Sequence, residues 1–160
     1  MNSKEIQDLL MIFMDSKPIQ ITNYSGLGHE ADVLMVTKAR MVYEYEIKTS
    51  RADFKKDFSK VRKHQIYSSD RPYLLKYRNY PLKPNHFYYV CVEGLIKPTE
   101  IPKYAGLIYI TTEGFVHYIK KAPKLHSYKL PEGMIWNICS TLTSRIKHGC
   151  SYIRHKHGNK

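Results

Sequence analysis

Two carboxylates and one ammonium group in the first third of the chain could act together on a phosphate ester. Glu46 and Lys48 lie in the run 42–50, whose apolar and aromatic residues predict a strand. Side chains alternate across a strand, so Glu46 and Lys48 share one face and Ile47 points the other way. The run 32–37 predicts a second, buried strand. A connection of about five residues would pair the two strands antiparallel and place Asp32 across from Glu46.

This arrangement predicts a site for a divalent cation. Two carboxylates that lie close together repel, and burial further destabilises their ionised forms. Mg²⁺ removes this repulsion and is usually held by one or two carboxylates, water and substrate phosphate. We therefore expect Asp32, Glu46 and the carbonyl of Ile47 to bind Mg²⁺, with Mn²⁺ as a substitute. Lys48 could orient or deprotonate the attacking water, or neutralise charge in the transition state. A Glu-x-Lys pair on a strand is also a common solvated face, so these residues alone are a weak signal.

A basic helix is predicted directly after Lys48, from about Arg51 to Tyr67. Ser50 and Asp53 fit a capping box at its start, and Asp53 and Asp57 lie where the helix dipole favours acids. Its apolar face is expected to contain Phe54, Phe58, Val61 and Gln65.

The bases of this helix could lie along a phosphate backbone, where each neutralised phosphate adds to a salt-dependent affinity. The candidates for binding nucleic acid are Arg51, Lys55, Lys56, Lys60, Lys63 and His64. A Lys-rich helix face is also often only a solvated face. His64 could instead form a hydrogen bond within the fold.

The net charge favours a polyanionic partner. The 160 residues include 26 Lys and Arg but 14 Asp and Glu, a formal net charge of +12. Such an excess repels itself unless a polyanion lies nearby, and DNA is the first candidate. A membrane partner is not expected, because no apolar run approaches the ~20 residues that span a bilayer. Three cysteines without metal-type spacing predict a reduced, cytoplasmic protein with Cys91 buried.

The stretch around the predicted site resembles the PD-(D/E)XK nuclease superfamily. Ala31-Asp32-Val33 followed by Glu46-Ile47-Lys48 is similar to its motif, with Ala31 in place of the proline. The run EIKTSRADFKKDFSKVRKH resembles the MmcB-type DNA-repair branch and related phage proteins, as does YAGLIYIT. The similarity covers roughly residues 28–112. It implies that Asp32 and Glu46 are metal ligands and that Lys48 is the catalytic lysine.

Archaeal-type Holliday-junction resolvases are similar in outline and suggest accessory residues. They add an acid from the first helix, for which Glu5 or Asp8 is the loose counterpart, and a serine before the Asp strand, here Ser25. Glu30 is an alternative catalytic acid, because it would share a face with Asp32 if the strand extends that far. It could equally be a solvated strand end.

The predicted fold is α/β, with a restriction-endonuclease-like αβββαβ core and a mixed sheet flanked by helices. Residues 1–150 are expected to form one domain, followed by a basic tail at 151–160. The predicted elements are a helix at 4–15 capped by Ser3, a turn-rich segment at 18–29, strands at 32–37, 42–50, 87–92, 106–111 and 115–119, and a helix from 131 to about 147. The connection 69–86 interleaves bases and aromatics, which suits contact with single-stranded or distorted nucleic acid.

The expected function is Mg²⁺-dependent hydrolysis of phosphodiester bonds in DNA. The enzyme would be a structure-selective endonuclease in repair or recombination, and a homodimer could cut two strands. Two alternatives stay open. One is a non-catalytic DNA- or RNA-binding protein on a nuclease fold, and the other is a phage protein that acts on a host partner.

Overall fold

The computed structural model describes the backbone of residues 1–71 and 80–157 and the side chains of these residues up to 148. The chain divides into two compact units, Met1–Lys129 and Leu130–Lys160. The first unit contains α1 (Ser3–Phe13), β1 (Ile19–Tyr24), β2 (Ala31–Val36), β3 (Val42–Lys48), α2 (Arg51–Asp57), α3 (Val61–Ser68), β4 (His86–Val92), a 3₁₀ turn (Pro98–Glu100), β5 (Ala105–Ile110) and β6 (Val116–Lys120). The second unit contains α4 (Glu132–His157), which continues through most of the predicted tail.

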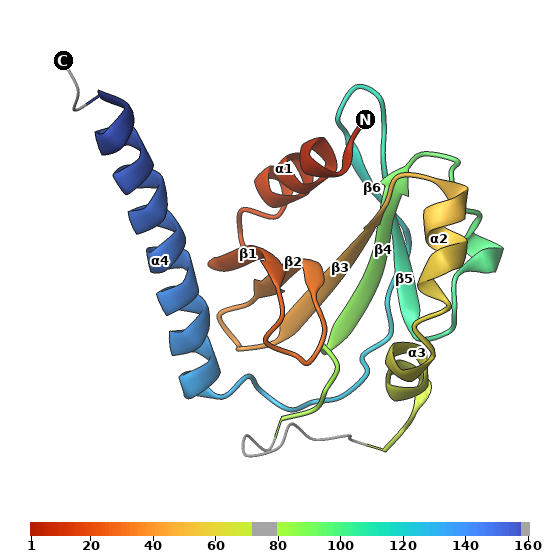
Figure 1. Ribbon diagram of the computed structural model, residues 1–160. Coiled ribbons are helices and arrows are strands. Elements are labelled where there is room, and N and C mark those ends of the chain that lie inside the picture. The colour runs from red at the N-terminus through yellow and green to blue at the C-terminus, as the bar shows by residue number, and fades with distance from the viewer. Residues whose placement is uncertain (72–79, 158–160) are drawn as a thin grey trace. The chain divides into compact units, whose positions relative to one another are not determined.

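The six strands form one mixed sheet in the order β1-β2-β3-β4-β5-β6. The pairs β1–β2, β2–β3 and β5–β6 are antiparallel, whereas β3–β4 and β4–β5 are parallel. A parallel pair needs a crossover connection, and α2 and α3 lie in the crossover from β3 to β4 (Figure 1). The predicted α/β architecture, a mixed sheet flanked by helices, is therefore confirmed, and the elements from α1 to β4 follow the order αβββαβ if α2 and α3 count as one helical segment.

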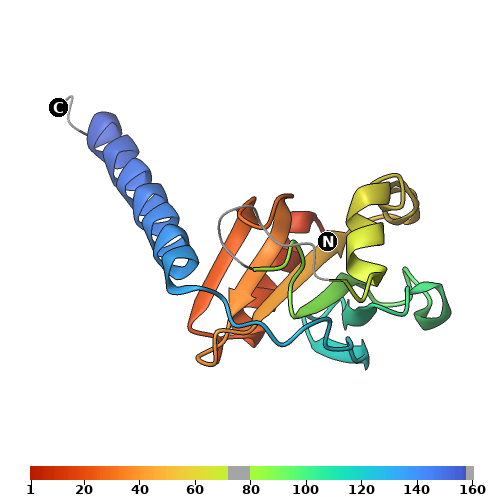
Figure 2. The same cartoon turned by 90° about the horizontal axis from the view of Figure 1, so that it is seen from below.

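Each face of the sheet has its own apolar core. On one face α1 packs against β2 and β3, through Ile6, Leu10, Val33, Tyr45 and Ile47. On the other face α2 and α3 pack against β4 and β5, through Phe54, Ile66, Tyr67, Phe87, Tyr89 and Leu107. Figure 2 shows α2 and α3 together on one side of the sheet. The even-numbered residues of β3 point to this second face, because side chains alternate and Tyr45 and Ile47 face α1.

Strand β1 was not predicted, because Pro18 and the NYSGLG segment suggested turns throughout 18–29. The turn is confined to the residues after Tyr24, where the Gly28 N–H donates to the carbonyl of Ser25 at 3.3 Å. Upstream of that turn, residues 19–24 pair with β2 in a regular antiparallel register. Ile21 and Tyr24 are buried by this pairing, so apolar burial outweighs the local turn preference.

The predicted helix 51–67 is two helices, which is the main correction to the expected fold. The N–H groups of Phe58, Ser59 and Lys60 each bond to the carbonyl three residues earlier, at 3.3, 3.0 and 2.9 Å. These tight turns end α2 and redirect the chain. The expected apolar face is accordingly wrong: Phe54 is buried, but Phe58 and Val61 are 39% and 58% exposed.

Polar side chains cap the N-termini of α1 and α2 by accepting hydrogen bonds from backbone N–H groups. Ser50 caps α2 as predicted, because its hydroxyl accepts from the Asp53 N–H at 3.1 Å. Asn2, not Ser3, caps α1. The Asn2 side chain accepts from the Glu5 N–H at 3.0 Å, and the Glu5 carboxylate accepts from the Asn2 N–H at 2.8 Å. None of the helices in the described parts of the chain is long and apolar enough to cross a membrane.

The packing of α1 can be tested with one substitution made at two positions. Ile6 is fully buried beneath the sheet, whereas Ile12 on the same helix is 73% exposed. Ile6→Ala should lower the free energy of unfolding by about 2–5 kcal/mol, because it removes apolar burial and leaves a cavity. Ile12→Ala should change it by less than about 0.5 kcal/mol. Urea unfolding followed by circular dichroism measures both, and equal losses would show that α1 does not pack as described.

Candidate active site

Asp32, Glu46 and Lys48 lie together on the face of the sheet that α2 and α3 cover. The pairing of Val33 with Tyr45 continues to place Asp32 beside Glu46. One oxygen of Asp32, Oδ2, accepts a hydrogen bond from the backbone N–H of Ile47 at 2.7 Å. Lys48 Nζ donates to Glu46 Oε1 at 3.0 Å. The predicted juxtaposition of two carboxylates and one ammonium group is therefore present.

Glu46 is the centre of this cluster and contacts three lysines. Lys48 and Lys60 lie at 3.0 and 3.1 Å from Oε1, and Lys63 lies at 2.7 Å from Oε2. Burial raises the pKa of Glu46, but the ammonium groups of Lys63 and Lys48 outweigh burial and hold it well below its usual range. The carboxylate is thus ionised at any physiological pH.

Asp32 has the opposite balance. Its burial, followed by the negative charge of Glu46, raises its pKa from the ordinary 3.8 to about 6. The hydrogen bond from Ile47 and the charges of Lys48 and Lys63 lower it, but by less. The two carboxylates therefore differ: three lysines contact Glu46, whereas the charges of Lys48 and Lys63 only partly offset the burial of Asp32.

Glu44 is a buried acid of the same face that the prediction missed. It lies two residues before Glu46, and its carboxylate contacts His29 at 3.0 Å, the Tyr67 hydroxyl at 2.7 Å and Lys63 at 3.2 Å. Burial raises the pKa of Glu44, yet Lys63 and His29 bring it below its usual value. The alternation Glu44-x-Glu46-x-Lys48 was a visible signal, since these three residues must share a strand face.

Asp57 is a second acid that the site contains, although its position in the helix suggested a dipole role. Its side chain is buried at the end of α2, where Oδ2 accepts from the Tyr89 hydroxyl at 2.7 Å. Its other oxygen, Oδ1, lies 3.0 Å from Lys60 Nζ and 3.4 Å from Lys48 Nζ. Asp57 and Glu46 thus share the same two ammonium groups.

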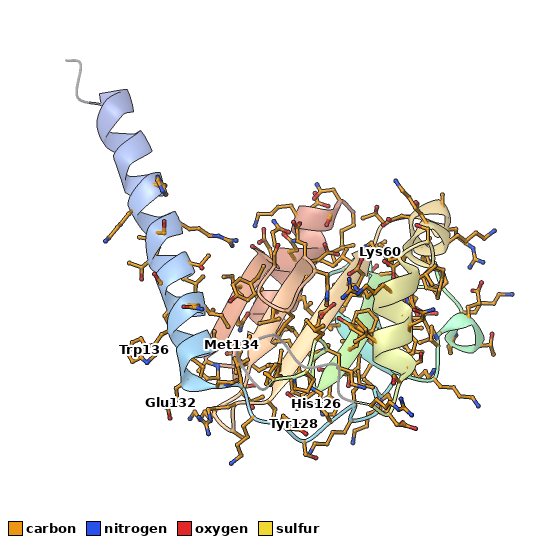
Figure 3. The ribbon with its side chains drawn as sticks, turned by 60° about the horizontal axis from the view of Figure 1, so that its bottom comes forward. Lys60, His126, Tyr128, Glu132, Met134 and Trp136 are labelled. Atoms are coloured by element: carbon orange, nitrogen blue, oxygen red, sulfur yellow. The ribbon has the colours of Figure 1, made fainter. Side chains whose placement is uncertain are left out.

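The predicted phosphate-binding lysines do not form one exposed face. Lys55 and Lys56 are exposed on α2, and Lys60 is half-exposed on the connection to α3 (Figure 3). Lys63, in contrast, is buried between Glu44 and Glu46, which raise its pKa above the usual value in spite of burial. The expectation that Lys63 lies along a phosphate backbone is wrong, because two buried carboxylates need its charge.

His64 and Arg51, which were also predicted to bind nucleic acid, form contacts within the protein itself. His64 Nε2 bonds to the carbonyl of Asp57 at 2.8 Å, and Nδ1 bonds to the hydroxyl of Tyr104. The alternative interpretation of His64, a hydrogen bond within the fold, is therefore the correct one. The guanidinium of Arg51 forms a two-pronged ion pair with Glu100, at 2.8 and 2.5 Å.

The accessory residues are not part of the cluster. Glu30 is exposed and precedes β2, which begins at Ala31, so the strand does not extend far enough to carry it. Ser25 is exposed in the turn after β1. On α1, Glu5 caps the helix and Asp8 pairs with Lys4. Of the connection 69–86, residues 72–79 lie outside the described part of the chain.

A polar hollow borders the Oε1 side of Glu46. It has a volume of about 230 Å³ and is lined by Lys48, Asp53, Lys56, Asp57, Ser59 and Lys60. Three of these residues carry ammonium groups and one carries a hydroxyl, which are groups that bind phosphate oxygens. We call this space the lysine hollow.

The donor set for a cation is small. Within residues 1–71 and 80–148, no group of three or more His, Cys, Asp and Glu side chains is arranged to hold a metal ion. The protein could therefore offer the carboxylates of Asp32 and Glu46 and a backbone carbonyl. Mg²⁺ commonly binds to such a set, because it keeps water molecules and takes up substrate oxygens.

Comparison with known proteins gives a structure with a similar fold and no match to a protein of known function. No family model matches the chain, and no curated protein matches its sequence. A solved structure of a protein of unknown function from Silicibacter pomeroyi is similar, with a TM-score of 0.57 and 14% sequence identity. The similarity covers 93% of this chain and 87% of that chain. At this identity the likeness concerns the fold alone.

The raised pKa of Asp32 predicts a stability difference that depends on pH. Because the folded-state pKa is raised, protonation stabilises the fold below about pH 4, and this contribution is lost as the pH rises through about 6. Asp32→Asn carries no charge at any pH. In EDTA, its unfolding free energy should exceed that of the wild type by roughly 2 kcal/mol at pH 8 and should approach it at pH 4.

Urea unfolding at several pH values measures this difference. Asp15→Asn is the control, since Asp15 is exposed after α1. A gap between Asp32→Asn and the wild type that stays constant from pH 4 to 8 would contradict the assigned pKa.

The role of Lys63 as an internal counter-ion predicts a large loss of stability. Lys63→Met should lower the unfolding free energy by about 3–5 kcal/mol, because Glu44 and Glu46 would lose a shared buried partner. The matched substitution Lys55→Met, on the exposed face of α2, should change it by less than about 0.5 kcal/mol. Thermal unfolding of the two variants side by side gives the comparison, and similar values would refute a structural role for Lys63.

Proposed function

We propose that this protein is a metal-dependent endodeoxyribonuclease that hydrolyses phosphodiester bonds in DNA. The observation that supports this most directly is the meeting of Asp32, Glu46 and Lys48 on one sheet face beside the lysine hollow. The set combines hard oxygen ligands, a fixed ammonium group and a hollow in which three lysines outnumber two aspartates. The net charge of +12 is consistent with a polyanionic substrate.

The donor chemistry fits a divalent cation. Burial, followed by the negative charge of Glu46, raises the pKa of Asp32, and the charges of Lys48 and Lys63 do not fully offset this. Asp32, Glu46 and the carbonyl of Ile47 would hold Mg²⁺, for which Mn²⁺ would substitute. When bound, the metal would polarise the scissile phosphate and lower the pKa of a bound water.

The lysines would have separate tasks. Lys48 is fixed by Glu46 at 3.0 Å and by Asp57 at 3.4 Å, so its ammonium group could orient the attacking water or stabilise the negative transition state. Lys60 has a 52% exposed side chain and therefore has room to leave Glu46 when a cation or phosphate arrives. Lys63 is buried and would stay in place, which keeps Glu46 oriented.

The biological setting is inferred from the resemblance of residues 28–112 to DNA-repair and phage nucleases. A structure-selective enzyme of repair or recombination is the form of the proposal that this resemblance favours. A homodimer could present two such sites to the two strands of one duplex. Lys55 and Lys56, exposed beside the lysine hollow, would contact the flanking backbone.

A second candidate is a nucleic-acid-binding protein on the same fold without catalysis. The three lysines around Glu46 favour it, because they already neutralise a carboxylate that a metal would need. Titration with Mn²⁺ separates the two candidates. Heat of binding that disappears in Asp32→Asn supports the enzyme. No heat, together with tight and salt-sensitive DNA binding, supports the binding protein.

The enzyme proposal predicts that one isosteric substitution abolishes cleavage. Glu46→Gln should lower the cleavage rate on the order of 10²–10³-fold, since it removes a metal ligand and releases Lys48. The measurement is a panel of duplex, single-stranded, flapped and four-way DNA with Mg²⁺ or Mn²⁺. Glu113→Gln, exposed in the turn before β6, is the matched control and should cleave like the wild type.

Circular dichroism should show that both variants are folded. If Glu46→Gln and the wild type behave alike on every substrate, the nuclease proposal is wrong.

A further inference from the structure

A second hollow, with a different lining, includes Lys63, which contacts Glu46 Oε2. It has a volume of about 280 Å³. Its apolar walls are Leu27, Ile66 and Leu82, and its polar groups come from His29, Arg62 and Lys63. The lysine hollow is lined by charged residues and one serine, without a leucine or isoleucine, so the two spaces differ in the chemistry that they can bind. We call this second space the leucine hollow.

Lysines from the walls of the two hollows contact opposite oxygens of the buried Glu46 carboxylate. Lys63, in the wall of the leucine hollow, contacts Glu46 Oε2 at 2.7 Å. Lys48 and Lys60, in the wall of the lysine hollow, contact Oε1 at 3.0 and 3.1 Å. The two linings therefore meet at one ion-pair cluster, and together they offer groups for an anionic part and for a flat apolar part of one ligand. A nucleotide has these two parts.

The turn before β2 shapes the wall of the leucine hollow. Gly28 has a φ of +90°, which strains other residues, and a Cβ at this position would lie 2.9 Å from Leu82 Cδ2. A side chain here would push against Leu82. Glycine therefore lets the turn come close to Leu82 without filling the space between them.

His29 gives the leucine hollow a fixed polar edge. Its Nε2 lies 3.0 Å from Glu44 and 2.6 Å from the Tyr67 hydroxyl, and the same hydroxyl donates to Glu44. These contacts hold the ring in one orientation. The other ring nitrogen, Nδ1, is then the atom of His29 that can bond to the polar edge of a ligand.

We infer that the leucine hollow receives the base of the nucleotide whose phosphate occupies the lysine hollow. This inference rests on the proposed nuclease function and specifies its substrate: a nucleotide whose base has left the stack. The volume of about 280 Å³ is slightly below the ~300–1,000 Å³ of pockets for drug-sized ligands, and a single base is smaller than such ligands. Arg62 is exposed at the rim, where it can contact the adjoining backbone.

A base in this hollow would explain selectivity for irregular DNA. Extruding a base from a regular duplex requires unpairing and unstacking, which are least unfavourable at mismatches, damage or single strands. The enzyme would therefore cut fastest where a base is already unpaired. Selection would depend on how readily a base leaves the stack and not on the sequence of base pairs.

Binding of two small probes tests the inference apart from cleavage. Deoxyadenosine 5′-monophosphate and 2-deoxyribose 5-phosphate differ only by the base. Wild-type protein in EDTA should bind the nucleotide about tenfold more tightly than the sugar phosphate, as measured by NMR titration. Leu82→Trp, which fills the hollow, should remove this difference and leave the affinity for the sugar phosphate unchanged.

Leu95→Trp is the matched control, because Leu95 is a partly buried leucine at another place on the same core. If Leu82→Trp does not fold, Leu82→Ala replaces it in the experiment. This substitution enlarges the hollow and should weaken nucleotide binding. Equal affinity of the wild type for both probes would overturn the inference while leaving Mg²⁺-dependent cleavage intact. Tighter nucleotide binding that is sensitive to Leu82, found in a protein that cuts no DNA, would support the base pocket and reject the nuclease proposal.

Discussion

Strand β3 carries three buried charged side chains on one face, and their need for partners governs the structure around them. Glu44, Glu46 and Lys48 are 0–4% exposed. Ionised groups in such surroundings are strongly destabilised unless ion pairs and hydrogen bonds compensate them. The compensation comes from the crossover that follows the strand: Lys63 from α3, and Lys60 from the connection between α2 and α3. The crossover is therefore bound to the sheet by charge as well as by apolar packing.

The same balance accounts for the break between α2 and α3. A continuous helix would have kept Phe54, Phe58 and Val61 on one apolar face. In the structure, the chain turns at 58–60, so that Asp57 and Lys63 are both buried while Phe58 and Val61 are exposed. Contacts with charged groups on β3 thus accompany the partial exposure of Phe58, whose ring still packs against Phe54 and His64, and the exposure of Val61. This arrangement would be unfavourable in a purely structural helix, and it suits a site that needs its charges held in place.

Much of the site was predictable, because strand alternation and hairpin spacing are local rules. They placed Asp32 beside Glu46 and Lys48, and they predicted the mixed α/β architecture. The unpredicted features depend on contacts between distant segments. Strand β1 forms because its partner β2 outweighs the turn preference of its sequence. Strand alternation could have placed Glu44 on the same face as Glu46, but its pairing with Lys63 depends on α3 lying over β3, which no periodicity within either segment reveals.

The parallel pairing of β3 with β4 also has a kinetic consequence. The two strands are joined through α2, α3 and a long connection, so their contact closes a large loop and is formed at an entropic disadvantage. Two of the three lysines that contact Glu46, Lys60 and Lys63, lie within that loop, whereas Lys48 ends β3 itself. A partly folded chain that contains only the β1–β3 meander would hold Asp32, Glu46 and Lys48 in register but without Lys60 and Lys63. The acid cluster would then be completed only when the crossover docks, late in folding, so that a competent site and a finished fold would arrive together.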